Sequence, residues 1–365
     1  MTRALLALLL ILVHVPVAEG ARRRAARHPS PAAPPAAVVA AAGEAAAAAL
    51  VAGAPAVQIA VSDRGQIIYS AAFGMSDRES GTAATPRSVV QVGSITKQFT
   101  AAAILRLAER GVVSLDDRIE KFVPEFNPRG ATITLRHLLN HTSGVGAINP
   151  NEYVPLTREN CITLINAQPM AFTPGSRFSY SNTGYRLLGY AIESITGKSF
   201  ADVLHSEFVL PLGLLDTGVC GTSTLPVPDG YGQFQGTLMR TPAIAMSVPF
   251  AAGALCSTAS DLVRWSYALE TGGAILTDSY ATMVSPARLT NNTFAPYGLG
   301  QFLQNQLGRQ AVWHTGGIPG FQSSLLYFPQ DDIAVAVIIN ALPAPAGADA
   351  HLIALAVARA ALPAP

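Results

Sequence analysis

The chain has 365 residues, of which 50% are hydrophobic and 13% are charged, and its formal net charge is +1. This composition supports a large buried core, so it excludes a chain that is disordered overall, and the length allows one large domain or two lobes. The near-neutral charge lacks the electrostatic footprint of nucleic-acid binding, and we expect no nucleic-acid partner.

The N-terminal segment predicts export. Residues 1–20 are typical of a secretory signal peptide, because a basic residue precedes an apolar run that ends in small residues. The run is shorter than the roughly 20 residues of a membrane-spanning helix, so we expect no stable span. More positive charge follows the run than precedes it, which leaves an uncleaved N-terminal anchor or a misassigned start as alternatives. These charges are Arg22, Arg23, Arg24 and Arg27.

A linker and then the main domain follow. Residues 21–36 are rich in Ala, Pro and Arg and predict a linker. Residues 37–363 are expected to form one domain. Its first segment, 37–51, is dense in Ala and predicts a helix. Residues 57–61 and 66–73 then predict a β-hairpin around an Asp-Arg-Gly turn.

The stretch 91–100 carries the strongest chemical signal. Gly93 precedes the pattern Ser-x-x-Lys, formed by Ser94 and Lys97, which leads into a helical segment that ends near Gly111. Residues three apart share one face of a helix, so the two side chains should lie side by side. A serine hydroxyl needs a base beside it, and a lysine in a partly apolar pocket can lose enough pKa to serve as one. The helix N-terminus offers free N–H groups for an oxyanion.

Helical signals dominate from there to about residue 217. Thr134 is expected to cap a helix over residues 135–141. Residues 183–195 predict another helix, which Gly197 closes.

The pattern changes past about residue 294. Short strand-like runs broken by Gly, Pro and Asp cover residues 297–302, 310–314, 323–328 and 332–340, and a closing helix is predicted over 351–361. Strands therefore occur at both ends of the domain with helices between them. The simplest assembly is an α+β fold, an α/β sandwich. One mainly antiparallel sheet is built from both termini and flanked by helices, with a mostly helical lobe inserted.

The three cysteines, Cys161, Cys220 and Cys256, are widely spaced and match no metal or redox pattern. At most one disulfide can form, and the spacing does not indicate which. Buried thiols that act as small hydrophobic side chains are the favoured interpretation.

Two histidines stand at a spacing that could bind a metal on a helix. His137 and His141 are four apart, but the glutamate of H-E-x-x-H is missing and no third ligand is evident. We therefore expect structural roles for both and no metal. No Gly-rich phosphate loop and no G-x-S-x-G motif occur, and we expect no organic cofactor.

Two further stretches offer partners for Ser94. Tyr180 and Asn182 lie two residues apart just before a predicted helix, and supply a phenol and an amide. The other stretch ends a predicted strand with two small residues, which let a substrate backbone approach closely. It reads Trp313-His314-Thr315-Gly316-Gly317.

Together, Ser-x-x-Lys, Tyr-x-Asn and His-Thr-Gly, in this order on helix, loop and strand, resemble the serine β-lactamase and penicillin-binding-protein superfamily. The nearest branch is the class C-like group of esterases, D-aminopeptidases and D-alanyl-D-alanine carboxypeptidases. The likeness covers about residues 40–360. Further similar stretches are 137–144, 172–175, 252–262, 297–300 and 317–321.

The resemblance implies a β-lactamase/transpeptidase-like fold and a role for each motif residue. Ser94 is implied as the nucleophile that forms an acyl-enzyme and Lys97 as its base. Tyr180 is implied as a second proton shuttle. Asn182 would orient Lys97 and a substrate amide. The N–H groups of Ser94 and Gly317 would form the oxyanion hole at the end of the His-Thr-Gly strand.

One departure concerns the strand motif. Many relatives carry Lys-Thr-Gly there, and this chain has His314, which is mostly neutral at neutral pH. Small-molecule esters, amides or D-amino-acid peptides therefore fit better than carboxylate-bearing β-lactams. The expected function is a serine hydrolase of such substrates. A β-lactamase, or a penicillin-binding sensor or scaffold with little turnover, is the alternative.

Ordinary structural roles are the competing interpretation of each motif residue. Ser94 and Lys97 could be an ordinary helix start, and Tyr180 a core tyrosine. Asn182 could simply cap a helix, and His314 could fill a strand edge by hydrogen bonding. The loops expected to shape specificity are residues 145–170 and 220–250.

Overall fold

The computed structural model describes residues 34–222, 225 and 228–363. The expected signal peptide, 1–20, and nearly all of the expected linker lie outside these residues. Within the described part, no helix is both long and apolar enough to cross a membrane.

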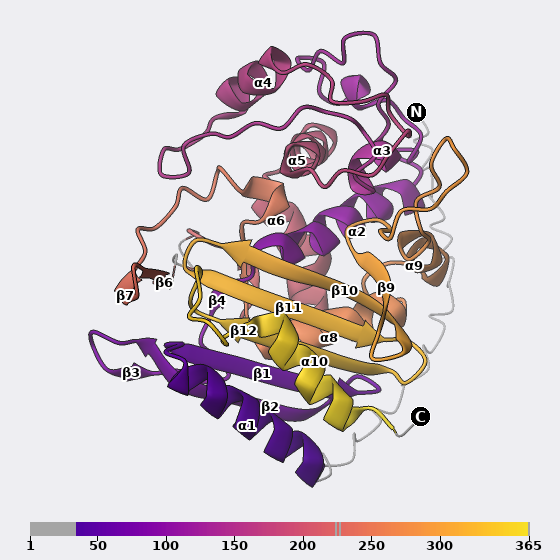
Figure 1. Ribbon diagram of the computed structural model, residues 1–365. Coiled ribbons are helices and arrows are strands. Elements are labelled where there is room, and N and C mark those ends of the chain that lie inside the picture. Colours follow the sequence, from indigo (N-terminus) through magenta and orange to yellow (C-terminus); the bar gives the residue numbers. More distant parts are fainter. Residues whose placement is uncertain (1–33, 223–224, 226–227, 364–365) are drawn as a thin grey trace, which may run out of the picture.

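A seven-stranded antiparallel sheet is built from both ends of the domain (Figure 1). Its order is β3-β2-β1-β12-β11-β10-β9, so the N-terminal hairpin joins the C-terminal strands where β1 pairs with β12. This confirms the expected α+β architecture. The strands are β1 (Ala56–Asp63), β2 (Gln66–Asp77), β3 (Thr82–Ala83), β9 (Phe302–Gln306), β10 (Arg309–Ile318), β11 (Phe321–Phe328) and β12 (Ile333–Ile339).

Helices cover both faces of this sheet. On one face, α1 (Ala36–Val51) and α10 (Ala350–Ala361) pack on each other and on the strands (Figure 1). On the other face, α8 (Ala259–Glu270) packs against β1 and β12. The central strand β12 is therefore buried along its whole length, which explains why its sequence is uninterrupted Ile, Ala and Val.

The chain between β3 and β9 forms the inserted, mostly helical lobe. Its helices besides α8 are α2 (Thr96–Glu109), α3 (Leu135–Leu139), α4 (Arg158–Ala167), α5 (Asn182–Thr196), α6 (Phe200–Leu204), α7 (Leu210–Leu212) and α9 (Thr277–Met283). Short helical turns are η1 (Gly93–Ile95), η2 (Ile119–Lys121), η3 (His205–Val209) and η4 (Phe250–Ala252). Two small sheets that the sequence did not predict combine β4 (Val90–Gln91) with β8 (Leu255–Ser257) and β5 (Gly218–Val219), and β6 (Tyr231–Phe234) with β7 (Thr237–Arg240).

Local capping sets the ends of the helices near the site. The hydroxyl of Thr134 accepts a hydrogen bond from the backbone N–H of His137, as expected. Helix α3 nevertheless ends at Leu139, two residues early, because His141 adopts a left-handed φ of 60°. Gly197 closes α5 with a φ of 66°, as expected.

The prediction of a strand over residues 297–302 is wrong. Only Phe302 of that run belongs to a strand, as the first residue of β9. Gly300 has a φ of +84°, and a Cβ there would lie 2.8 Å from the backbone oxygen of Lys97. The segment is therefore a tight loop pressed against α2, which only glycine permits.

The cysteine interpretation is also corrected. Cys220 and Cys256 form a disulfide, while Cys161 is a buried free thiol, as expected. Cys256 lies on β8 and pairs with Gln91 of β4. Gln91 precedes Ser94 by three residues. The disulfide therefore fastens the strand that supports the nucleophile turn.

Replacing both Cys220 and Cys256 by Ser should lower the free energy of unfolding by about 3–4 kcal/mol, because the bridge closes a 36-residue separation in the unfolded chain. Urea denaturation measured by circular dichroism gives the difference. Cys161→Ser serves as the control for a thiol outside the bridge. Equal midpoints for the double variant and the wild type would contradict the expectation.

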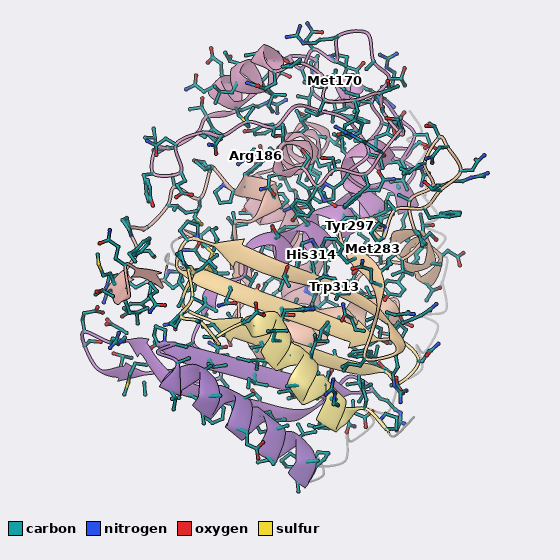
Figure 2. The ribbon with its side chains drawn as sticks, viewed as in Figure 1. Met170, Arg186, Met283, Tyr297, Trp313 and His314 are labelled. Carbon is teal, nitrogen blue, oxygen red and sulfur yellow. A yellow bond between two sulfur atoms is a disulfide. The ribbon has the colours of Figure 1, made fainter. Side chains whose placement is uncertain are left out.

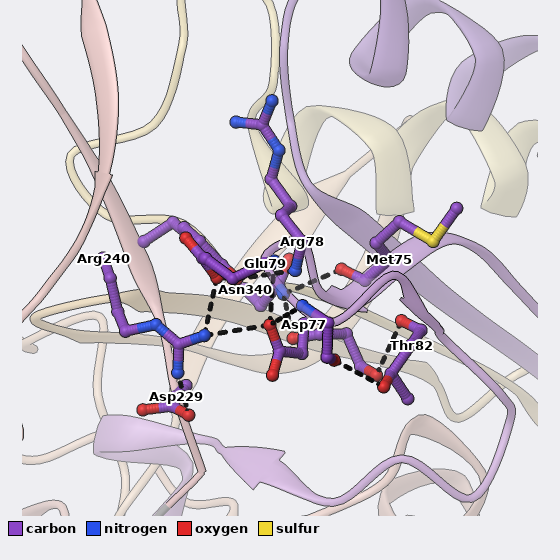
Figure 3. Close-up of polar contacts among 11 residues, drawn as sticks. Met75, Asp77, Arg78, Glu79, Thr82, Asp229, Arg240 and Asn340 are labelled. Carbon is purple, nitrogen blue, oxygen red and sulfur yellow. Dashed lines mark hydrogen bonds and ion pairs between the residues drawn. The ribbon is translucent and has the colours of Figure 1, made fainter.

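An arginine-centred cluster ties the β6–β7 hairpin to the end of β2 (Figure 3). Arg240 donates hydrogen bonds to Asp77 (2.9 Å) and Glu79 (2.6 Å) and also pairs with Asp229. The hydroxyl of Tyr231 donates to Glu79 at 2.6 Å. These contacts anchor the chain just before residues 244–249, which form one wall of the cleft described below.

Candidate active site

The turn that carries Ser94 lies directly against the end of β10. Gly93 has a φ of +51°, and a Cβ there would come within 2.9 Å of the backbone nitrogen of Gly317. A Cβ on Gly316 would overlap the carbonyl oxygen of Val92. Both positions therefore need glycine, and the close approach brings the N–H of Gly317 beside Ser94.

Lys97 connects the nucleophile turn to two other segments. Its Nζ lies 2.9 Å from the Oγ of Ser94. It also donates hydrogen bonds to the Oδ1 of Asn182 and to the backbone oxygen of Ala252, both at 2.8 Å. The expected pairing of Ser94 with Lys97 and of Lys97 with Asn182 is thus present in the geometry, and the Ala252 carbonyl is an addition that the sequence did not reveal.

The surroundings favour the uncharged form of Lys97. The side chain is fully buried, and burial lowers its pKa well below the ordinary value of 10.5, with a further lowering from the charge of Arg186. A neutral amine has two N–H groups and one lone pair. The two N–H groups match the oxygens of Asn182 and Ala252, which leaves the lone pair for the hydroxyl of Ser94.

Tyr180 lies beside Lys97 and Ser94. The residue is 39% exposed, but its hydroxyl faces inward, where burial raises its pKa and a hydrogen bond with Ser94 partly opposes the rise. The Nζ of Lys97 lies 4.7 Å from the centre of the Tyr180 ring. The phenol therefore keeps its proton at neutral pH and can donate it.

His314 lies on β10 near Tyr297 (Figure 2) and is only 1% exposed. Its Nε2 is 3.0 Å from the hydroxyl of Tyr297, and its Nδ1 is 2.6 Å from the carbonyl oxygen of Thr315. The carbonyl can only accept, so Nδ1 carries the proton and Nε2 accepts from Tyr297. Burial and the nearby Lys97 lower the pKa of His314 to about 3, so it is neutral near pH 7.

Both histidines of the His137–His141 pair accept hydrogen bonds from the backbone. His137 accepts from the N–H of Thr134, and the Nδ1 of His141 accepts from the N–H of Ser181. Across residues 34–222, 225 and 228–363 there is no group of His, Cys, Asp and Glu side chains that could hold a metal ion. Both histidines therefore have structural contacts, in line with the expectation for them.

A cleft of about 230 Å³ opens beside Ser94. Two loops form its walls, residues 148–152 and 244–249, and both fall within the segments expected to shape specificity. Asn182, Arg186 and Gly317 also line it. His314 is buried, while Thr315 is half-buried and lies two residues before Gly317 on β10.

Three residues of this site were not predicted from the sequence. Arg186 sits one turn beyond Asn182 on α5, so helical spacing was an available signal. Tyr297 stood in a recognised motif, but its contact with His314 depends on the tertiary fold. Ala252 acts through its backbone oxygen, for which the sequence carries no signal.

Comparisons with known proteins identify the family of the chain. The family model described as Beta-lactamase matches residues 44–358. The chain is 29% identical to penicillin-binding protein 4* of Bacillus subtilis (strain 168) over 294 residues, which cover 74% of this chain and 64% of that protein. The chain spans about three fifths of the length of the curated relatives it matches.

Two solved structures share the fold over most of their length. The octameric penicillin-binding protein homologue from Pyrococcus abyssi superposes with a TM-score of 0.75 and 28% identity, covering 87% of this chain and 76% of that one. The D-amino acid amidase from Ochrobactrum anthropi SV3, complexed with L-phenylalanine amide, gives a TM-score of 0.78 and 25% identity, covering 89% and 98%.

Proposed function

The chain belongs to the Beta-lactamase family, and on that premise we propose that it hydrolyses carboxylic esters or small amide and D-amino-acid peptide bonds through an acyl-serine intermediate. The observation that carries the proposal is the position of Lys97. Its Nζ is buried and 2.9 Å from the Oγ of Ser94, and its other two hydrogen-bonding directions are taken by carbonyl oxygens.

Acylation follows from these positions. The lone pair of Lys97 accepts the proton of the Ser94 hydroxyl as Oγ bonds to the substrate carbonyl carbon. The oxyanion that forms is held by the N–H groups of Ser94 and Gly317; losing one such donor typically costs on the order of 100- to 1,000-fold in rate. When the bond to the leaving group breaks, Tyr180 supplies the proton that the leaving oxygen or nitrogen needs.

Deacylation uses the same groups in reverse. A water molecule gives a proton to Tyr180, which lost its own to the leaving group, and attacks the acyl carbon, while Lys97 still holds the proton of Ser94. The tetrahedral intermediate then releases the acid, and Ser94 regains its proton. No step requires a metal or an organic cofactor.

The charge of the site supports a substrate preference. In the position where many relatives carry lysine, His314 is buried and neutral, so it offers no cation to the carboxylate of a β-lactam. Similarity to a D-amino acid amidase supports small amides as substrates. Ester or amide hydrolysis is therefore the first choice, and β-lactam hydrolysis is the alternative.

We also propose that the protein is exported. The disulfide between Cys220 and Cys256 supports this, because such bonds persist in oxidising compartments.

Side-by-side hydrolysis of a short-chain nitrophenyl ester and a chromogenic cephalosporin tests the proposed reaction. Ester turnover with little cephalosporin turnover supports it. Fast cephalosporin turnover would favour the β-lactamase. If neither is turned over, D-amino-acid amides are assayed, and stable acylation by labelled penicillin without any turnover would favour a sensor or scaffold.

Replacing Tyr180 by Phe should lower kcat for hydrolysis of an alkyl ester, whose leaving group needs a proton, by about 100- to 10,000-fold with a smaller effect on KM, because the proton donor is lost and the ring remains. Steady-state kinetics measure both constants. Tyr153→Phe, at an exposed tyrosine that follows the cleft residue Glu152 in the chain, is the matched control. An unchanged kcat in Tyr180→Phe would remove Tyr180 from the proposed proton path.

A further inference from the structure

Arg186 is a buried cation at the cleft with no anionic partner. It lies on α5, one turn beyond Asn182, and is only 6% exposed (Figure 2). Its Nε donates a hydrogen bond of 2.7 Å to the carbonyl oxygen of Val248. In the part of the chain that the structure describes, its two terminal nitrogens have no hydrogen-bond or ion-pair partner, and they are not fully sealed from solvent.

Such an arrangement is unfavourable unless something compensates it. An arginine stays charged inside a protein. A buried charge without a counterion loses its hydration, and no ion pair offsets that loss. Burial lowers the pKa of Arg186, as this reasoning predicts. Holding the Val248 carbonyl uses one of five N–H groups, and a neutral side chain could do that. The charge itself therefore points to a ligand.

Other charged groups near the cleft leave room for an anion. Glu152 lines the cleft on the facing loop, but none of its oxygens comes within 4.0 Å of the Arg186 guanidinium. Its side chain is half-buried, so water screens part of its charge. Burial lowers the pKa of Lys97 well below its ordinary value, and His314 is buried with its pKa lowered to about 3. Arg186 is thus the cation that an anion in this cleft would meet.

The cleft receives the acyl part of a substrate. The leaving group faces Tyr180, which gives it a proton, so the acyl part takes the space that opens from Ser94. The cleft extends from Ser94 past Asn182 and Gly317 to Arg186. A planar guanidinium with two free terminal nitrogens matches the two oxygens of a carboxylate.

We propose that Arg186 selects substrates whose acyl part carries a carboxylate, which its two terminal nitrogens bind while the scissile carbonyl lies at Ser94. The inference rests on the proposed function of the same site. It assigns the acid recognition to α5, whereas the Lys-Thr-Gly strand motif of relatives would place it on β10.

The test compares two nitrophenyl esters with the same linear acyl chain, one ending in a carboxylate and the other in a neutral carboxamide. A series of chain lengths is used, and the spontaneous hydrolysis measured with Ser94→Ala is subtracted. At the best length, the wild type should show a kcat/KM at least about tenfold higher for the carboxylate ester, as expected for a charge-assisted pair of hydrogen bonds.

Variants separate the charge from other effects of Arg186. Arg186→Met should reduce the ratio of the two kcat/KM values to about one or lower, and the ratio cancels any change in Lys97 that affects both esters. Arg186→Lys should retain an intermediate ratio, since it keeps the charge without the planar fork. Glu152→Gln should raise the ratio, because it removes a repelling carboxylate. Thermal unfolding verifies that each variant is folded.

The outcomes distinguish the two proposals. If the wild type hydrolyses both esters at similar kcat/KM at every chain length, the inference about Arg186 is overturned and the proposed function stands. A carboxylate preference that persists in Arg186→Met also overturns it. If Arg186→Met does not fold, the ratios of Arg186→Lys and Glu152→Gln decide. If no ester or amide is hydrolysed, the proposed function fails and the inference falls with it.

Discussion

Replacing Ser94 by Ala should lower kcat for nitrophenyl ester hydrolysis by about 10⁴- to 10⁶-fold, because no other hydroxyl lies at the Nζ of Lys97 in the described structure. The oxyanion N–H groups and the cleft remain in the variant. They still accelerate direct attack of water on the bound ester, so some activity over the uncatalysed reaction remains. Steady-state kinetics with a high enzyme concentration measure the loss. Covalent labelling by a fluorophosphonate probe should disappear at the same time.

The fold should survive this change. The Ser94 side chain is half-buried, and its hydroxyl contacts Lys97 and Tyr180 without supporting any strand or helix end. We therefore expect the urea midpoint to move little. Ser206→Ala, on the exposed turn η3, is the matched control and should keep full activity and labelling. Labelling that persists in Ser94→Ala would eliminate Ser94 as the nucleophile.

The sequence predicted those parts of the fold that local patterns determine. The hairpin of β1 and β2 and the buried strand β12 carry turn residues and apolar runs, and both were expected with small errors at their ends. The strands β4, β5 and β8 have two or three residues each, and only their neighbours make them strands. The loop before Phe302 alternated like a strand, but Gly300 packs closely against α2 and Gly298 against Met283 at the end of α9.

The same division holds for the site. Ser94 and Lys97 are three residues apart, so helical geometry alone predicted their contact. Asn182 reaches Lys97 across 85 residues, and only the family resemblance suggested that contact. The disulfide spans 36 residues without a local signal, and the burial of His314 depends on Tyr297. Tertiary packing, which a single sequence does not display, decides each of these.

Lys97→Met should lower kcat/KM for the ester by about 100- to 10,000-fold, the usual contribution of a general base. Methionine fills a similar volume but leaves the oxygens of Asn182 and Ala252 without their donor. The matched control is Lys121→Met, whose amine lies on the surface and pairs with Asp117. Activity close to wild type in Lys97→Met would mean that another group takes the Ser94 proton.

The pH profile tests the protonation state of Lys97 directly. In the wild type, kcat/KM should rise with pH and level off well below pH 10.5, because Lys97 is a base only when neutral and burial lowers its pKa. The pKa of Tyr180 is raised above its ordinary value of 10.0, so the plateau should not fall as the pH approaches 10. A basic limb centred near 10.5 would contradict the buried, neutral lysine. Lys97→Met should lose the basic limb altogether.

The protonation of Lys97 should also make the free energy of unfolding depend on pH, and both stability and activity should rise with pH. Between the lowered pKa of folded Lys97 and the ordinary value of 10.5, the unfolded chain binds one proton more than the folded one. The free energy of unfolding contributed by this residue therefore increases as the pH rises through that window, and it stays at its lowest value below the window. Urea denaturation at several pH values should show this slope in the wild type and a flatter one in Lys97→Met. Burial makes Lys97 a more effective base near neutral pH. It should therefore lower the free energy of unfolding most at low pH, where the lysine is protonated and catalysis is slowest.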